Sequence, residues 1–228
     1  VFFRRGSQNV VSPGPNPAAR ARLVICAHLD APRSGAIYNP RRARFGARLA
    51  RRSPVPLGPY RVVFWSLALL LPLLGARMAG VDSNVLSVVQ LVPTLVLLVA
   101  VFGLIEIELS EIVPGANDNA SGVAAAVSLA TELDADPPAN LDVWLVLDGG
   151  EECQQEGMRR FMRAHRKDFD RATTFFLSID SVGGGDVCFE TSAGWLVSYA
   201  MDRRLVELCT AIAEAEPAAI RGVAKVSV

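Results

Sequence analysis

The chain has 228 residues, of which 51% are hydrophobic, and its mean hydropathy is +0.30. This length suits one domain with an insertion, and the apolar content is high for a wholly soluble protein. The formal net charge is zero, so nucleic-acid binding is not indicated. Four cysteines occur without metal-type pairs, which is typical of free thiols in a reducing compartment.

Three short apolar runs predict buried strands, and each of them leads into residues of the types that bind metals. In an open α/β sheet, the carboxyl ends of the strands gather the catalytic groups. The runs are residues 23–27, which precede His28, residues 141–147, which precede Glu151 and Glu152, and residues 174–179, which precede Asp180.

A fourth motif stands at the start of a predicted helix. Residues 120–133 carry apolar side chains at helical spacing, and Asp118 or Asn119 is available as the N-cap. We therefore expect Asp118 to lie at the mouth of this helix.

The residue types at these positions suit a hydrolytic zinc site. Zinc binds imidazole nitrogen and carboxylate oxygen, and one carboxylate can bridge two ions. Such a site also needs a base close to the metal-bound water, for which Glu151 is the candidate. Asp30 lies on the same side of an extended segment as His28, so we expect it to accept the second imidazole N–H and fix the tautomer. The candidate metal ligands are His28, Asp118, Glu152 and Asp180.

These motifs, in this order, resemble the co-catalytic di-zinc aminopeptidases, a zinc exopeptidase family that includes glutamate carboxypeptidase and the catalytically silent transferrin receptor. The resemblance implies an α/β fold of three layers, with a mixed sheet flanked by helices. It implies two zinc ions, one bound by His28 and Asp180. Glu152 would bind the other ion, and Asp118 would bridge the pair. The matching segments are residues 27–30, 115–124, 150–152 and 179–180.

The chain departs from the family pattern at three places. Asn117 stands where the family often has Asp, and residues 153–158 replace a shorter turn. The family's second zinc also takes a histidine well after the Asp180 motif, whereas this chain has only His28 and His165. His165 lies in a basic stretch typical of a solvated helix face. We therefore expect a chain truncated at both ends, with the missing ligand beyond residue 228.

Residues 41–110 are predicted to be an insertion, because the family joins the first two motifs by a short loop. Residues 41–61 hold seven arginines and no acidic residue, which predicts a basic linker able to rest on anionic lipid. Two apolar stretches follow, at about residues 62–81 and 85–105. The second is long enough for a bilayer, which takes about 20 residues. A buried core hairpin is the alternative, since the first stretch contains Pro72.

A transmembrane hairpin also fits the order of the motifs. His28 precedes the insertion and Asp118 follows it, so an even number of crossings returns both to one side. By the positive-inside rule, the arginine run places that side in the cytoplasm. We therefore expect a multi-pass cell-membrane protein whose cytoplasmic peptidase domain comprises residues 1–40 and 111–228.

Taken together, these features predict a membrane-anchored zinc exopeptidase, in the first instance an aminopeptidase. Its substrate would be a peptide, hydrolysed by a metal-activated water with Glu151 as the general base. Two alternatives stay open, namely a non-catalytic scaffold or receptor on the same fold and an amide-processing enzyme resembling glutaminyl cyclase. The sequence of residues 118–122 favours a peptidase over the cyclase.

Overall fold

The structure is a computed structural model, and the chain divides into two compact units. Most of the predicted basic linker, residues 41–61, lies outside the described residues. The described residues are 6–39, 41, 44, 59–194, 196–217 and 223–224. The first unit comprises Val1–Pro32, Ile112–Phe189 and Asp202–Gly222, and the second comprises Arg33–Glu111, Glu190–Met201 and Val223–Val228.

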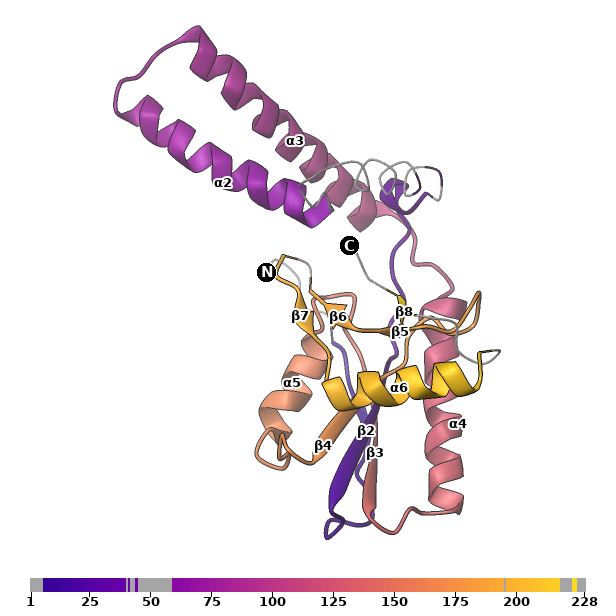
Figure 1. Ribbon diagram of the computed structural model, residues 1–228. Helices are drawn as coiled ribbons and strands as arrows, with labels where there is room; N and C mark the ends of the chain where they lie inside the picture. The colour runs from indigo at the N-terminus through magenta and orange to yellow at the C-terminus, as the bar shows by residue number, and fades with distance from the viewer. Residues whose placement is uncertain are drawn as a thin grey trace. The chain divides into compact units, whose positions relative to one another are not determined.

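A four-stranded mixed sheet with the order β1-β3-β2-β4 forms the centre of the first unit (Figure 1). Strand β2 is parallel to β3 and to β4, whereas β1 is antiparallel to β3. His28 lies opposite Asp148 in the register, so the carboxyl ends of β2 and β3 meet at one edge. The strands are β1 Val10–Ser12, β2 Ala21–His28, β3 Leu141–Asp148 and β4 Thr174–Ser178.

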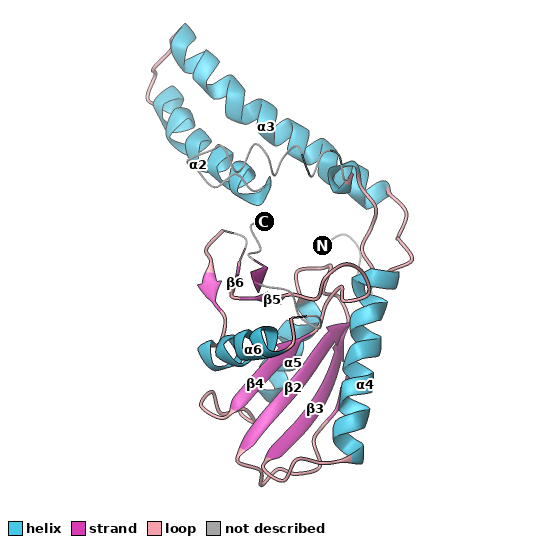
Figure 2. Ribbon diagram, turned by 45° about the vertical axis from the view of Figure 1, so that its right-hand side comes forward, coloured by secondary structure: helices cyan, strands magenta, loops and turns pink. Residues whose placement is uncertain are grey.

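Helices cover both faces of this sheet (Figure 2). The second half of β2 is buried at every residue, and successive side chains point to opposite faces, so both faces must be covered. Val24 and Cys26 pack with Phe161 of helix α5, Glu156–His165, on one face. Ile25 and Ala27 pack with Ala126 of helix α4, Gly122–Ala135, on the other. The predicted mixed α/β fold with a sheet between helices is therefore confirmed.

The remaining helix of the first unit, α6, spans Arg203–Ala215. Asp202 caps its N-terminus by accepting the N–H groups of Arg204 and Leu205. The Arg204 guanidinium lies 4.2 Å from the centroid of the Phe175 ring in β4. This contact fastens α6 to the edge strand of the sheet.

At the opposite end of the strands, an ion pair joins β2 to β3. Arg22 and Asp142 are partners in the register, and Nε of Arg22 lies 2.8 Å from Oδ2 of Asp142. The Asp142 carboxylate also accepts hydrogen bonds from the Trp144 indole and from the backbone N–H of Asn16. Burial would raise the pKa of Asp142, but these three donors hold it below its usual value.

Helices α2, Pro59–Met78, and α3, Asn84–Leu109, lie side by side in the second unit (Figure 1). Both are long and apolar enough to cross a bilayer. In the most apolar 18-residue stretch of each helix, 6% is buried. Ser83 caps α3, because its Oγ accepts the N–H of Leu86. The two helices begin and end within a few residues of the predicted spans.

The other elements of the described residues are short turns and strands. An irregular turn, Ala116–Ser121, precedes α4, and a single 3₁₀ turn spans Ala36–Tyr38. The short strands are β5 Phe189–Glu190, β6 Ser192–Ala193, β7 Tyr199–Ala200 and β8 Val223–Ala224.

Candidate metal centre

His28 ends strand β2 and is 5% exposed. Its Nε2 lies 3.2 Å from Oδ1 of Asp118 and 3.7 Å from Oδ1 of Asp180. Its Nδ1 lies 3.0 Å from the backbone carbonyl oxygen of Asp30. Because a carbonyl oxygen only accepts hydrogen bonds, this contact assigns the proton to Nδ1 and leaves Nε2 to face the carboxylates.

Asp118 and Asp180 are brought together by Asn119, which is 2% exposed. The Asn119 Oδ1 accepts the N–H of Gly122 at 3.1 Å and that of Ser181 at 3.0 Å. Its Nδ2 donates to the carbonyl oxygen of Ile179 at 3.1 Å. The Asn119 amide therefore joins the turn that carries Asp118, the first residue of α4 and the chain around Asp180.

Glu151 and Glu152 lie on the loop between β3 and α5, and the Asp30 carboxylate holds their backbone. Oδ1 of Asp30 accepts the N–H of Glu151 at 3.0 Å, and Oδ2 accepts the N–H of Glu152 at 3.1 Å. The expected partner of this carboxylate, Nδ1 of His28, lies 3.7 Å away. The carboxylate thus orients the glutamate loop, while the Asp30 carbonyl oxygen orients the imidazole.

The structure brings the four predicted metal ligands and the predicted base into two overlapping groups that share His28. One group adds Asp118 and Asp180, and the other adds Glu151 and Glu152. Within each group, one potential ligand atom per residue lies within 4.8 Å of the others. An imidazole nitrogen facing carboxylate oxygens is a donor set that suits zinc.

Electrostatics in the centre favour a cation. Burial, together with the negative charges of Asp118 and Glu151, raises the pKa of Glu152 to about 7. Burial and nearby carboxylates also raise the pKa values of Asp118 and Glu151. Burial lowers the pKa of His28, but the nearby carboxylates of Asp180 and Glu151 prevail and bring it to about 9. A divalent cation would relieve this repulsion among carboxylates.

Sequence reasoning missed Asp148, a buried carboxyl group beside the centre. It is 4% exposed and lies opposite His28 in the register. Burial raises its pKa to about 6. Only the pairing of β2 with β3 reveals this proximity, because Asp148 is far from His28 in the sequence.

His165, the other histidine of the chain, belongs to a different environment. Its ring centroid lies 4.8 Å from that of Phe161, and its Nδ1 lies 3.1 Å from Oδ2 of Asp168. The helix that carries it ends at His165 itself. This histidine therefore packs at the end of α5, against an aromatic ring, rather than on a wholly solvated face.

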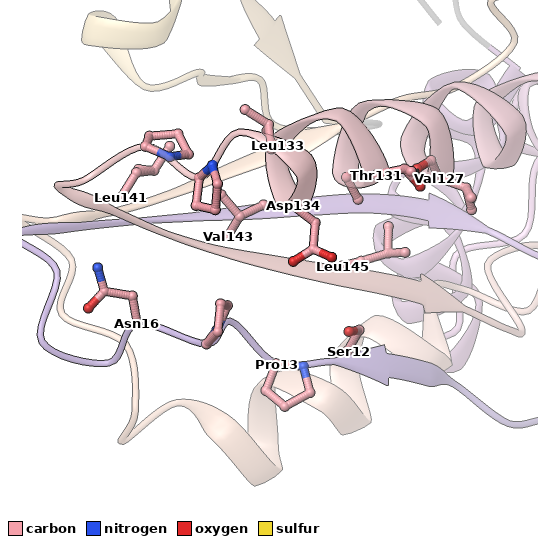
Figure 3. Close-up of a pocket in the computed structure, with 14 residues that line it drawn as sticks. Ser12, Pro13, Asn16, Val127, Thr131, Leu133, Asp134, Leu141, Val143 and Leu145 are labelled. Carbon is pink, nitrogen blue, oxygen red and sulfur yellow. Dashed lines mark hydrogen bonds between the residues drawn. The ribbon is translucent and has the colours of Figure 1, made fainter.

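A cavity of about 340 Å³ lies elsewhere in the first unit, between α4, β3 and the segment after β1 (Figure 3). Prolines and aliphatic side chains dominate its lining, together with Asp134, Thr131 and Asn16. None of the predicted ligands lines it. The cavity is therefore separate from the candidate metal centre.

A sheet with a histidine and carboxylates at its carboxyl edge defines the class of metal-dependent α/β hydrolases. Residues 100–222, more than half of the chain, match the model of peptidase family M28. The chain therefore belongs to peptidase family M28, which indicates a zinc-dependent peptidase. No match was found among curated proteins or among solved structures.

Proposed function

We propose that the chain is a membrane-anchored zinc exopeptidase of the aminopeptidase type. The observation that carries the proposal is the convergence of His28 with two pairs of carboxylates at the carboxyl edge of the sheet. Membership of peptidase family M28 supports the peptidase activity. The proposal also covers cleavage at the N-terminus of the peptide, the zinc-binding role of each residue and the membrane anchor.

Four side chains would hold two zinc ions. His28 and Asp180 would bind one ion and Glu152 the other. Asp118 would bridge them, because its carboxylate has two oxygens and it belongs to the group that faces His28 Nε2. A bound zinc ion supplies Lewis acidity, which makes a water molecule more acidic and polarises a peptide carbonyl.

Glu151 is proposed as the general base. It would accept the proton of the attacking water on a carboxylate oxygen and then donate that proton to the leaving amine nitrogen. Burial raises its pKa above the usual glutamate value, which makes its carboxylate a stronger base toward the proton of the water. Its backbone N–H is held by the Asp30 carboxylate, so the position of Glu151 is fixed before substrate binds.

The charge of the centre supports an aminopeptidase over a carboxypeptidase. Five carboxylates surround His28, and their combined negative charge exceeds the positive charge that two zinc ions supply. A free peptide N-terminus carries an ammonium group, which such a site attracts, whereas a free C-terminus carries a carboxylate, which it repels. The five residues are Asp30, Asp118, Glu151, Glu152 and Asp180.

Two features support the membrane anchor and its orientation. The helix windows Tyr60–Met78 and Asn84–Leu109 are close to or above the roughly 20 residues that span a bilayer. Seven arginines lie in residues 41–61, directly before and at the start of the first helix, which by the positive-inside rule favours a cytoplasmic peptidase unit. The protein would then be a multi-pass protein of the cell membrane.

Metal content provides the first test. We expect about two zinc ions per chain for the full-length protein purified in detergent and measured by elemental mass spectrometry. Asp118→Ala should lose this zinc, whereas His165→Ala should keep it, because His165 stands apart from the centre. No bound zinc in the unaltered chain would contradict the proposed enzyme and favour a non-catalytic scaffold on the same fold.

Substrate comparison tests the exopeptidase part. A peptide with a free N-terminus should be cleaved, and the same peptide with an acetylated N-terminus should not, because acetylation removes the ammonium charge. Cleavage of both at equal rates would exclude the aminopeptidase. Cyclisation of peptides with N-terminal glutamine would instead indicate the amide-processing alternative.

A further inference from the structure

The loop that carries Glu151 and Glu152 is held in an uncommon backbone conformation. Gln154 and Gln155 have φ values of 68° and 57°, in the left-handed region that residues with a side chain seldom adopt. Gly150 has a φ value of 78°. Such a conformation persists only where surrounding contacts over-determine it. The contacts that close the loop are therefore part of what positions the two glutamates.

Asn9 bridges the two ends of this loop. Its Oδ1 accepts the N–H of Gly149 at 3.2 Å, directly after β3. Its Nδ2 donates to the carbonyl oxygen of Gly157 at 2.8 Å, in the first turn of α5. One amide side chain thus joins the residue before the loop to the residue after it.

Packing around the two glycines leaves no room for a side chain at either position. A Cβ atom on Gly149 would lie 2.3 Å from Ser7 Oγ and 2.8 Å from the carbonyl oxygen of Gln8. A Cβ atom on Gly157 would lie 2.0 Å from the carbonyl oxygen of Gly149. The segment before β1 therefore presses directly on both ends of the loop.

The sheet explains why Asn9 reaches this position. Val10 is the first residue of β1 and lies opposite Leu147 of β3. Because the two strands are antiparallel, the residue before β1 lies next to the residues that follow β3. Pairing of the edge strand thus delivers Asn9 to the start of the glutamate loop.

We propose that Asn9 is a positioning residue that keeps the loop bearing Glu151 and Glu152 closed. This role rests on the functions proposed for those two glutamates. Asp30 holds the middle of the loop through two backbone N–H groups, and Asn9 holds its ends. Asn9 lies outside residues 100–222, so the family match does not assign it.

Hydrogen exchange of the loop is the direct test, measured by mass spectrometry on the full chain in detergent. We expect Asn9→Ala to speed exchange in peptides covering residues 149–157 by about tenfold, because two hydrogen bonds that close the loop are lost. Peptides from β2 and α4 should exchange at the unaltered rate. The matched control is Asn16→Ala, which removes another asparagine of the N-terminal segment, bonded to Ala139 at the other end of β3.

The functional readouts are zinc affinity, from competition with a chromophoric chelator, and steady-state kinetics. Asn9→Ala should weaken zinc binding and lower kcat by roughly 10-fold to 100-fold, as loss of a supporting hydrogen bond does at metal sites. KM should change little, since Asn9 does not touch substrate. Asn9→Gln keeps both the acceptor and the donor but makes the side chain one methylene longer, so its effects should be intermediate.

Equal exchange of residues 149–157 in Asn9→Ala and Asn16→Ala would overturn the role of Asn9, whatever the activity. Faster exchange with unchanged zinc affinity and kcat would also overturn it. If Asn9→Ala exchanges rapidly throughout the first unit, Asn9→Gln decides by the same criteria. Absence of zinc and of peptidase activity in the unaltered chain would instead overturn the proposed function, and the positioning role with it.

Discussion

The two nitrogens of His28 have separate partners, and this division sets the chemistry of the centre. Nδ1 donates to the Asp30 carbonyl oxygen, which fixes the ring, and Nε2 faces Asp118 and Asp180. A neutral imidazole in this tautomer offers its lone pair at Nε2, where a zinc ion would bind. The buried position of His28 at the end of β2 keeps this geometry independent of solvent.

The variant Glu151→Gln tests the general base separately from the zinc ligands. The change keeps the shape of the side chain and removes its ability to accept a proton. We expect kcat to fall by about 10²-fold to 10⁴-fold, with zinc content unchanged, in peptide hydrolysis assays and elemental analysis. Glu156→Gln is the control, because this glutamate lies five residues further on and pairs with Arg160. A kcat for Glu151→Gln equal to that of the control would show that Glu151 is not the base.

Asn119→Ala tests the link between Asp118 and Asp180. Three buried hydrogen bonds would be lost, so we expect the free energy of unfolding to fall by about 2–4 kcal/mol. Zinc affinity should fall by about tenfold or more, because the two carboxylates are no longer held together. Denaturant titration and chelator competition measure the two effects. Asn117→Ala provides the comparison, since Asn117 precedes Asp118 and is exposed; a similar zinc affinity in both variants would refute the link.

The ends of the strands could be predicted from the sequence, whereas the register between the strands could not. The run of residues 23–27 ends at a histidine, so the position of His28 at the carboxyl end of β2 followed from the pattern alone. Asp148 became part of the site only through its pairing opposite His28. Asn9 reaches Gly149 and Gly157 across 140 and 148 positions of the chain, a proximity that no local pattern encodes.

The pair of Arg22 and Asp142 is expected to stabilise the other end of the sheet. Asp142→Asn should lower the free energy of unfolding by about 3 kcal/mol near pH 7, because it leaves a largely buried guanidinium without its carboxylate. Urea denaturation followed by tryptophan fluorescence measures the loss, since Trp144 donates to the same carboxylate. Asp136→Asn, at an exposed aspartate after α4, should change stability little.

The same pair predicts a dependence on pH with a definite sign. The pKa of Asp142 in the folded protein lies below its usual value of 3.8. Its stabilising contribution is therefore fully present above pH 3.8 and is lost as the pH falls through the lower, folded value. The stability difference between the unaltered protein and Asp142→Asn should stay constant from neutral pH down to that range and then shrink. A difference that instead shrank toward neutral pH would exclude this origin.

For the whole molecule, the sequence predicted the helical hairpin because its signal is local. A long run of apolar residues predicts a long apolar helix from the local sequence alone, and α2 and α3 appear within a few residues of the expected positions. The division between the two units depends on packing over long separations. The second unit accordingly includes Glu190–Met201, which the sequence analysis assigned to the peptidase domain.

Native cysteines allow the orientation of the chain to be tested. Cys153 and Cys188 are exposed, and in a cytoplasmic peptidase unit they should react with a membrane-impermeant maleimide only after cells are permeabilised. Asp82→Cys, in the loop between α2 and α3, should instead react in intact cells, because an even number of crossings places that loop outside. Mass spectrometry of the labelled peptides distinguishes the three positions. Labelling of Cys153 in intact cells would show that the orientation is opposite to the one proposed. If Asp82→Cys is as unreactive in intact cells as Cys153, the hairpin does not cross the membrane.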